Sequence, residues 1–147
     1  MEKLYIAYGS NMDAERMARR CPEAELLGTG ELKGYRLLFR GSKTGFYATI
    51  ERAAGYSVPV LCWSITRHDE QRLDYYEGFP NFYYKDMITV NLDGKQQDGL
   101  VYIMPKEHPF GLPNTSYYNL IARAYKALGF DLGILDRAMK DTEEYVK

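Results

Sequence analysis

Glu77 is the residue of this sequence whose position best suits acid–base chemistry. It ends a run with the pattern of a helix, immediately before Gly78 and Pro80. A carboxylate at the C-terminal end of a helix faces the negative end of the helix dipole, and aromatic neighbours limit its solvation. Both effects raise the pKa of a carboxyl group toward neutrality, as a general acid or base requires. An exposed surface glutamate beside a helix cap is the alternative that position alone leaves open.

A second candidate is the corner YGSN at residues 8–11, which follows a short apolar stretch. Backbone N–H groups at such a corner can bind an anion or stabilise an oxyanion. Gly9 would allow a ligand to come close to the backbone. Ser10 could in principle be a nucleophile, but no base is marked for it. A plain strand-to-helix turn is the other interpretation of this corner.

Other motifs that could hold a cofactor or a metal lack the required spacing. The segment GTGELKG is not G-x-G-x-x-G, and GSKTG lacks the upstream glycine of a phosphate-binding loop. His68 and His108 are far apart, and no His, Asp or Glu set has metal-ligand spacing. Cys21 and Cys62 form no C-x-x-C pair. We therefore predict no metal site, no cofactor and no disulfide framework.

Length and charge limit the class of protein. The 147 residues suffice for one domain, 1–147, with its own core. A net charge of -1 gives no reason to expect a nucleic acid or an anionic membrane as partner. No apolar run reaches the roughly 18 residues of a membrane helix, and the N-terminus does not resemble a secretory signal. A cytoplasmic protein is the expectation. The 14 tyrosines suit a core or a pocket that needs hydroxyl groups on apolar walls.

Both strands and helices are expected to position these residues. We expect strands over residues 4–8, 24–30, 35–40, 47–51, 58–65, 83–92 and 99–104. We expect helices over residues 13–20, 67–77 and 117–128, and a last one to about residue 146. Thr66 and Asp69 have the pattern of a capping box, and Gly78 suits a left-handed cap. Most connections are too short for parallel crossovers. The predicted class is α+β, a small mixed, mostly antiparallel β-barrel or strongly curved sheet surrounded by helices.

Taken together, these segments resemble the γ-glutamylcyclotransferase family, also called AIG2-like. Five segments carry the resemblance, in the family's order and across nearly the whole chain: LYIAYGSNM, ATIERAAGYSVPVLCWSIT, LDYYEGF, GLVYIM and PNTSYYNLI. YGSN together with LDxxEG at this separation is the specific part. The related γ-glutamylamine branch tends to carry a Thr-Leu pair where this chain has Ser10-Asn11, so the YGSN branch is favoured.

The resemblance implies an enzyme that cyclises a γ-glutamyl amide or γ-glutamyl-amino acid to 5-oxoproline and releases the amine. It needs no cofactor and no metal, and it belongs to glutathione metabolism. Glu77 would take a proton from the attacking α-amine and return it to the leaving amine. The backbone N–H groups around Gly9, Ser10 and Asn11 would bind the substrate carboxylate or the developing oxyanion.

Tyrosines complete the implied site. Tyr8 begins the corner, and position in the family pattern suggests Tyr83, Tyr102 and Tyr117. Because tyrosines are doubled at 83–84 and 117–118, those two assignments are open by one position.

Two alternatives and one partner question remain at this point. A related enzyme could act on a special γ-glutamyl amide, such as γ-glutamyl-lysine or a natural-product intermediate. A non-catalytic binding module could have kept the pocket. The small-molecule γ-glutamyl substrate is the expected partner, and an apolar face on the last helices could support a homodimer.

Overall fold

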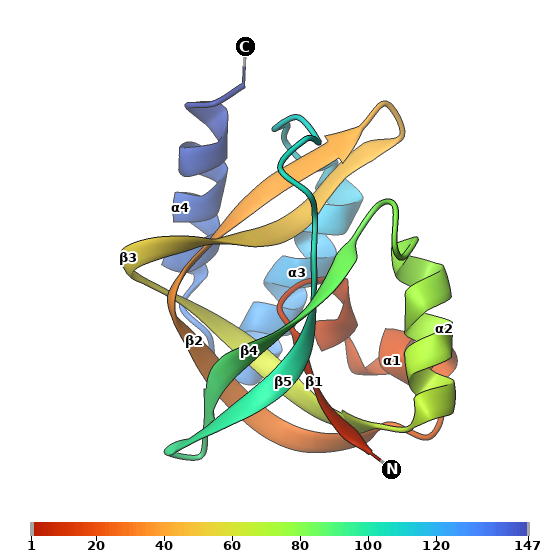
Figure 1. Ribbon diagram of the computed structural model, residues 1–147. Helices are drawn as coiled ribbons and strands as arrows, with labels where there is room; N and C mark the ends of the chain where they lie inside the picture. Colours follow the sequence, from red (N-terminus) through yellow and green to blue (C-terminus); the bar gives the residue numbers. More distant parts are fainter. Residues whose placement is uncertain (1, 147) are drawn as a thin grey trace.

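The computed structural model describes residues 2–146, and its five strands close into a barrel (Figure 1). The order around the barrel is β1-β3-β2-β4-β5. Neighbouring strands are antiparallel except β1 and β5, which run parallel. The predicted class, a mixed and mostly antiparallel barrel with helices outside, is confirmed. The strands are β1 (Lys3–Ala7), β2 (Glu25–Ser42), β3 (Gly45–Ile65), β4 (Tyr84–Leu92) and β5 (Lys95–Ile103).

Among residues 2–146, four α-helices and one short 3-10 helix surround the barrel (Figure 1). Helices α1 and α2 lie beside each other, and α4 packs against β2, where the Phe39 N–H donates to Thr142 Oγ1 at 3.1 Å. Within residues 2–146, no helix is long and apolar enough to cross a membrane. The helices are η1 (Ser10–Met12), α1 (Ala14–Arg20), α2 (Arg67–Glu77), α3 (Thr115–Leu128) and α4 (Leu132–Glu143).

Strands β2 and β3 form one long bent hairpin, and here the expected elements were wrong. The predicted strands 24–30 and 35–40 are a single strand, as are 47–51 and 58–65. The glycines that suggested turns lie at a bend inside the hairpin, where the register shifts after Lys33. Gly34 has φ 81° and Gly55 has φ 85°, a conformation that favours glycine. A bulged hairpin keeps its pairing while it bends around the barrel.

Two further bounds differ from expectation. Strand β5 begins at Lys95, not residue 99, because the turn before it is a tight one around Asp93 and Gly94, both with positive φ. Helix α4 ends at Glu143, three residues before the expected end.

The ends of α2 form as predicted. The Asp69 N–H donates to Thr66 Oγ1 at 3.1 Å, and the Thr66 N–H donates to Asp69 Oδ2 at 3.1 Å, which completes a capping box. At the other end Gly78 adopts a left-handed conformation, with φ 65°. Leu73 between them is fully buried. Both caps and this anchor fix where α2 stops, and Glu77 is its last residue.

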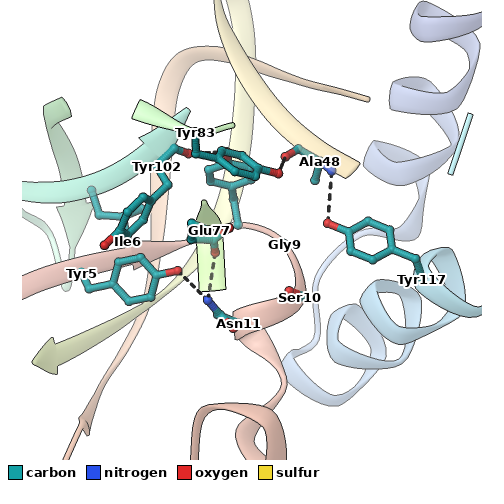
Figure 2. A pocket seen from close by; sticks show the side chains of 11 residues that line it. Tyr5, Ile6, Gly9, Ser10, Asn11, Ala48, Glu77, Tyr83, Tyr102 and Tyr117 are labelled. Atoms are coloured by element: carbon teal, nitrogen blue, oxygen red, sulfur yellow. Dashed lines mark hydrogen bonds between the residues drawn. The ribbon is translucent and has the colours of Figure 1, made fainter. Parts of the chain in front are cut away.

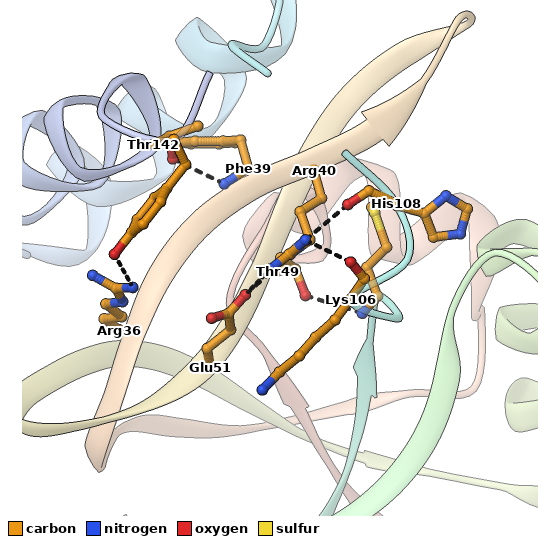
Figure 3. A network of polar contacts seen from close by, with 10 residues as sticks. Arg36, Phe39, Arg40, Thr49, Glu51, Lys106, His108 and Thr142 are labelled. Atoms are coloured by element: carbon orange, nitrogen blue, oxygen red, sulfur yellow. Dashed lines mark hydrogen bonds and ion pairs between the residues drawn. The ribbon is translucent and has the colours of Figure 1, made fainter. Parts of the chain in front are cut away.

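A buried arginine holds the segment between β5 and α3 against the barrel (Figure 3). Arg40 Nε and Nη2 donate to Glu51 Oε2 at 3.0 and 2.6 Å. Its Nη1 donates to the carbonyl oxygens of Lys106 and His108 at 2.9 and 2.8 Å. The guanidinium also lies 3.8 Å from the ring centroid of Phe110. These contacts determine the path of the chain into α3.

Replacing Arg40 by Met should therefore lower the free energy of unfolding by about 3–5 kcal/mol, because Glu51 and two carbonyl groups would lose their partner in a buried place. Urea denaturation followed by circular dichroism measures this change. The matched control is Arg123→Met, at an exposed position of α3, which should change stability by no more than about 0.5 kcal/mol. Equal effects of the two substitutions would contradict the structural role of Arg40.

Candidate active site

A cavity opens where β1 ends and the chain turns into η1 (Figure 2). It holds about 330 Å³ of empty space, including the part open to solvent. All eight residues that the sequence suggested for the site line this cavity, although they come from five different parts of the chain. The lining residues are Tyr5, Ile6, Tyr8, Gly9, Ser10, Asn11, Ala48, Glu77, Tyr83, Tyr102 and Tyr117.

Asn11 connects the corner to Glu77 (Figure 2). Its Nδ2 donates to Glu77 Oε1 at 3.3 Å and to the Tyr5 hydroxyl at 2.9 Å. Its Oδ1 accepts from Arg20 Nη1 at 2.9 Å, and its carbonyl oxygen accepts from Trp63 Nε1 at 3.2 Å. Because the amide group is held on both sides, it presents an N–H to the carboxyl group of Glu77 in a fixed direction.

The carboxyl group of Glu77 is poorly solvated. Burial raises its pKa from 4.5 to about 7, while the positive charges of Arg20 and Arg16 act in the opposite direction. This direction was predicted from the sequence, with the neighbouring rings of Tyr75 and Tyr76 among those expected to limit the solvation of Glu77. Both of those rings are exposed. The tyrosines that share the cavity with Glu77 are instead Tyr5, Tyr8, Tyr83, Tyr102 and Tyr117.

Two tyrosine hydroxyls hold the main chain of Ala48 on β3 (Figure 2). The Tyr83 hydroxyl donates to the Ala48 carbonyl oxygen at 2.8 Å, and the Ala48 N–H donates to the Tyr117 hydroxyl oxygen at 3.1 Å. Within the described residues, the Tyr117 hydroxyl hydrogen has no acceptor, so it is available to a ligand. Burial raises the pKa of both hydroxyls, which therefore stay neutral donors.

The remaining two tyrosines use their hydroxyls inside the protein. The Tyr8 hydroxyl donates to the carbonyl oxygen of Tyr102. The Tyr102 hydroxyl donates to Asp74 Oδ1 at 2.6 Å. Both rings thus line the cavity as walls. The sequence left it open which tyrosine of each doubled pair belongs to the site. Tyr83 and Tyr117 line the cavity, whereas Tyr84 and Tyr118 do not.

The corner after β1 is a single 3-10 turn. The Met12 N–H donates to the Gly9 carbonyl oxygen and the Asp13 N–H to that of Ser10, both at 3.1 Å. The N–H groups of Ser10 and Asn11 have no acceptor among residues 2–146. A Cβ atom at Gly9 would lie 3.3 Å from the Tyr117 hydroxyl and 3.4 Å from the Ala48 Cβ. Glycine therefore lets the corner, β3 and α3 meet closely.

Metal ligands do not gather in the described part of the chain: no three His, Cys, Asp or Glu side chains there could hold an ion together.

The family model described as γ-glutamyl cyclotransferase, AIG2-like, matches residues 5–119, a span that includes the corner, Glu77 and Tyr117. The chain belongs to this family.

Curated relatives and a solved structure agree with the family. The chain is 29% identical over 138 residues to the human γ-glutamylcyclotransferase and 30% identical over 138 residues to that of Bos taurus, in each case covering 88% of this chain and 73% of the relative. A solved γ-glutamyl cyclotransferase structure superposes with a TM-score of 0.84 at 26% identity, covering 94% of this chain and 86% of that one. The protein is thus a cyclotransferase enzyme with the barrel of its family.

Three residues that line this cyclotransferase's cavity, Tyr5, Ile6 and Ala48, were missed from the sequence, and so was Arg20, which contacts Asn11 beside it. Tyr5 lies in the predicted first strand, and its place on the cavity side gave no separate signal. Ala48 contributes main-chain groups, which leave no signature in side-chain type. Arg20 was assigned only to a helix, although its spacing from Asn11 brings it back over the corner. Asn11 itself was predicted for its backbone, whereas its side chain makes the contact to Glu77.

The raised pKa of Glu77 predicts a pH-dependent effect on stability. The native protein holds this proton more tightly than the unfolded chain, so the stabilisation is full below pH 4.5 and is lost as pH rises through about 7. The free energy of unfolding of Glu77→Gln, taken relative to that of the wild type, should therefore rise by up to about 3 kcal/mol between pH 4.5 and pH 8.5. Urea unfolding of both proteins across this range measures the gain. A gain of the same size in Glu15→Gln, at an exposed position of α1, would assign the effect to net charge and contradict the prediction.

Proposed function

We propose that this enzyme converts a γ-glutamyl amide or γ-glutamyl-amino acid into 5-oxoproline and a free amine, with Glu77 as general acid and base. The observation that carries the proposal is a carboxyl group with a pKa of about 7 in the same cavity as the free N–H groups of the corner. The names of the family and of its curated relatives support the same reaction class.

The proton balance of this reaction suits one carboxyl group. The substrate's α-amine is an ammonium at neutral pH and must lose a proton before its nitrogen can attack the γ-carbonyl carbon. That first proton goes to solvent. Glu77 accepts a second proton from the attacking nitrogen as the new C–N bond forms. It then gives a proton to the departing nitrogen as the old C–N bond breaks. The carboxylate is regenerated, so no other reactant is needed.

Ring closure needs the substrate to be curled. Because nucleophile and electrophile belong to one molecule, holding them together converts binding energy into rate. The walls formed by Tyr8 and Tyr102 and the close approach at Gly9 favour a compact substrate.

Three donors in the cavity have no partner within the described residues and can stabilise negative charge. They are the N–H groups of Ser10 and Asn11 and the hydroxyl hydrogen of Tyr117. We assign them to the developing oxyanion or to the α-carboxylate of the γ-glutamyl group. Ser10 then acts through its backbone and not as a nucleophile.

Glu77→Gln should lower kcat/KM for 5-oxoproline release by about 10²–10⁴-fold, because Gln cannot accept the proton. In the wild type, kcat/KM should rise with pH through about 7, since the free enzyme needs the ionised carboxylate. Chromatographic detection of 5-oxoproline from a panel of γ-glutamyl amides measures both, with Glu15→Gln as the charge control. A folded wild type that releases none from the panel would refute the proposal.

Ser10→Ala should reduce kcat/KM by less than about tenfold, because the backbone N–H is kept and the Ser10 hydroxyl makes no hydrogen bond within residues 2–146. The same assay, run beside Glu77→Gln, measures the difference. Equal losses in the two variants would show that the Ser10 hydroxyl takes part in the chemistry.

A further inference from the structure

Three side chains hold the side-chain amide of Asn11, which is buried at the edge of the cavity. Its Oδ1 accepts from Arg20 Nη1 at 2.9 Å. Its Nδ2 donates to the Tyr5 hydroxyl at 2.9 Å and to Glu77 Oε1 at 3.3 Å (Figure 2). The oxygen and both hydrogens of the amide group are therefore in use.

The three partners differ in how strongly they determine which end of this amide faces Glu77. Burial raises the pKa of Tyr5, so its hydroxyl stays neutral and can donate to an oxygen as well as accept from an N–H. A protonated Glu77 can likewise donate to an amide oxygen. A guanidinium has donors only, so Arg20 fits only an amide that turns Oδ1 toward it. With Arg20 in place, the N–H of Asn11 faces Glu77 whether or not the carboxyl group carries a proton.

Arg20 is anchored to the helix that carries Glu77. It is the last residue of α1, and its guanidinium lies 4.7 Å from the ring centroid of Tyr76 on α2. Its carbonyl oxygen accepts from Arg72 Nε, also on α2, at 2.5 Å. The packing of α1 on α2 therefore sets where the Arg20 donors lie relative to Asn11.

The orientation of the amide affects the charge of Glu77. An N–H directed at a carboxyl group favours the carboxylate, whereas a carbonyl oxygen in the same place favours the protonated acid. Within residues 2–146, no hydrogen-bond donor other than Asn11 Nδ2 contacts this carboxyl group. The positive charge of Arg20 also lowers the pKa of Glu77, against the larger effect of burial. Loss of Arg20 would thus favour the protonated form in two ways.

We propose that Arg20 is a positioning residue that holds the amide of Asn11 with its N–H toward Glu77 and thereby keeps the carboxylate form of Glu77 accessible at neutral pH. This inference rests on the role of Glu77 as the base in the cyclisation proposed above. The other ionisable groups that interact electrostatically with Glu77 stay the same when Arg20 is changed, and the tyrosines among them are neutral. They are Arg16 of α1, Tyr5 of β1, Tyr8 of the corner, Tyr83 before β4 and Tyr117 of α3.

A double-mutant cycle of Arg20→Met and Asn11→Ala tests whether Arg20 acts through Asn11. A ¹³C NMR titration of the Glu77 carboxyl carbon, assigned by the loss of its signal in Glu77→Gln, measures the pKa of this group without turnover. Arg20→Met should raise this pKa by about one unit or more, because both a nearby charge and the fixed amide are lost. In the Asn11→Ala background the same substitution should raise it by less than half as much, since only the charge remains to be lost.

The pH dependence of 5-oxoproline release gives a second readout. In Arg20→Met the rise of kcat/KM with pH should move to higher pH, so that the loss is about five- to tenfold at pH 7 and shrinks toward pH 9. A merely structural defect would lower the activity at every pH. Arg19→Met is the matched control, since it removes the same charge from an exposed position of α1 and should change neither the titration nor the pH profile.

Each outcome separates the two proposals. Equal pKa shifts in the wild-type and Asn11→Ala backgrounds would show that Arg20 acts by its charge alone, which overturns the inference, as would an unchanged pKa in Arg20→Met. A folded wild type that releases no 5-oxoproline refutes the cyclisation, while the titration still decides whether Arg20 orients Asn11. If Arg20→Met does not fold, Arg20→Gln replaces it in the cycle, because a glutamine amide can donate or accept and leaves the orientation of Asn11 undetermined.

Discussion

The hydrogen bond from Asn11 to Glu77 joins two parts of the chain that are 66 residues apart, and the arrangement of the site depends on it. Asn11 belongs to the turn after β1, and Glu77 is the last residue of α2. The bond can form only if α2 stops at the correct residue and the turn is tight. The capping box and the left-handed Gly78 satisfy the first condition, and the 3-10 turn from Gly9 satisfies the second.

A conflict between stability and chemistry is built into this contact. Burial at the barrel mouth disfavours the charged form of Glu77, and the charges of Arg20 and Arg16 on α1 only partly offset that effect. A fully paired carboxylate would be a poor base, and an isolated buried one would rarely ionise. The intermediate arrangement leaves the group able to exchange a proton near neutral pH. The helices therefore tune the carboxyl group as well as supporting it.

Local signals predicted much of this protein. The caps of α2 and the strands β4 and β5 depend on residues that are close in the sequence, and they were predicted from it. The bends of β2 and β3 were mistaken for turns because glycine has the same local signature in both, and only pairing across the barrel distinguishes them. Of the cavity, the eight residues named for the site were found. Tyr5, the main chain of Ala48 and the contact of Arg20 with Asn11 were not, since only long-range packing shows that they belong to the site.

The hydroxyls of Tyr83 and Tyr117, which hydrogen-bond to the main chain of Ala48, affect how this site can evolve. They hold an N–H and a carbonyl group, which every residue except proline supplies, so drift in the residue type at position 48 cannot remove the link directly. Size is the limit there, because the Ala48 Cβ already lies beside Gly9. Only the two tyrosine positions need a particular side chain for that contact. Enzymes descended from this one could therefore exchange loops and leaving groups freely while the strand, the corner and the first turn of α3 stay joined.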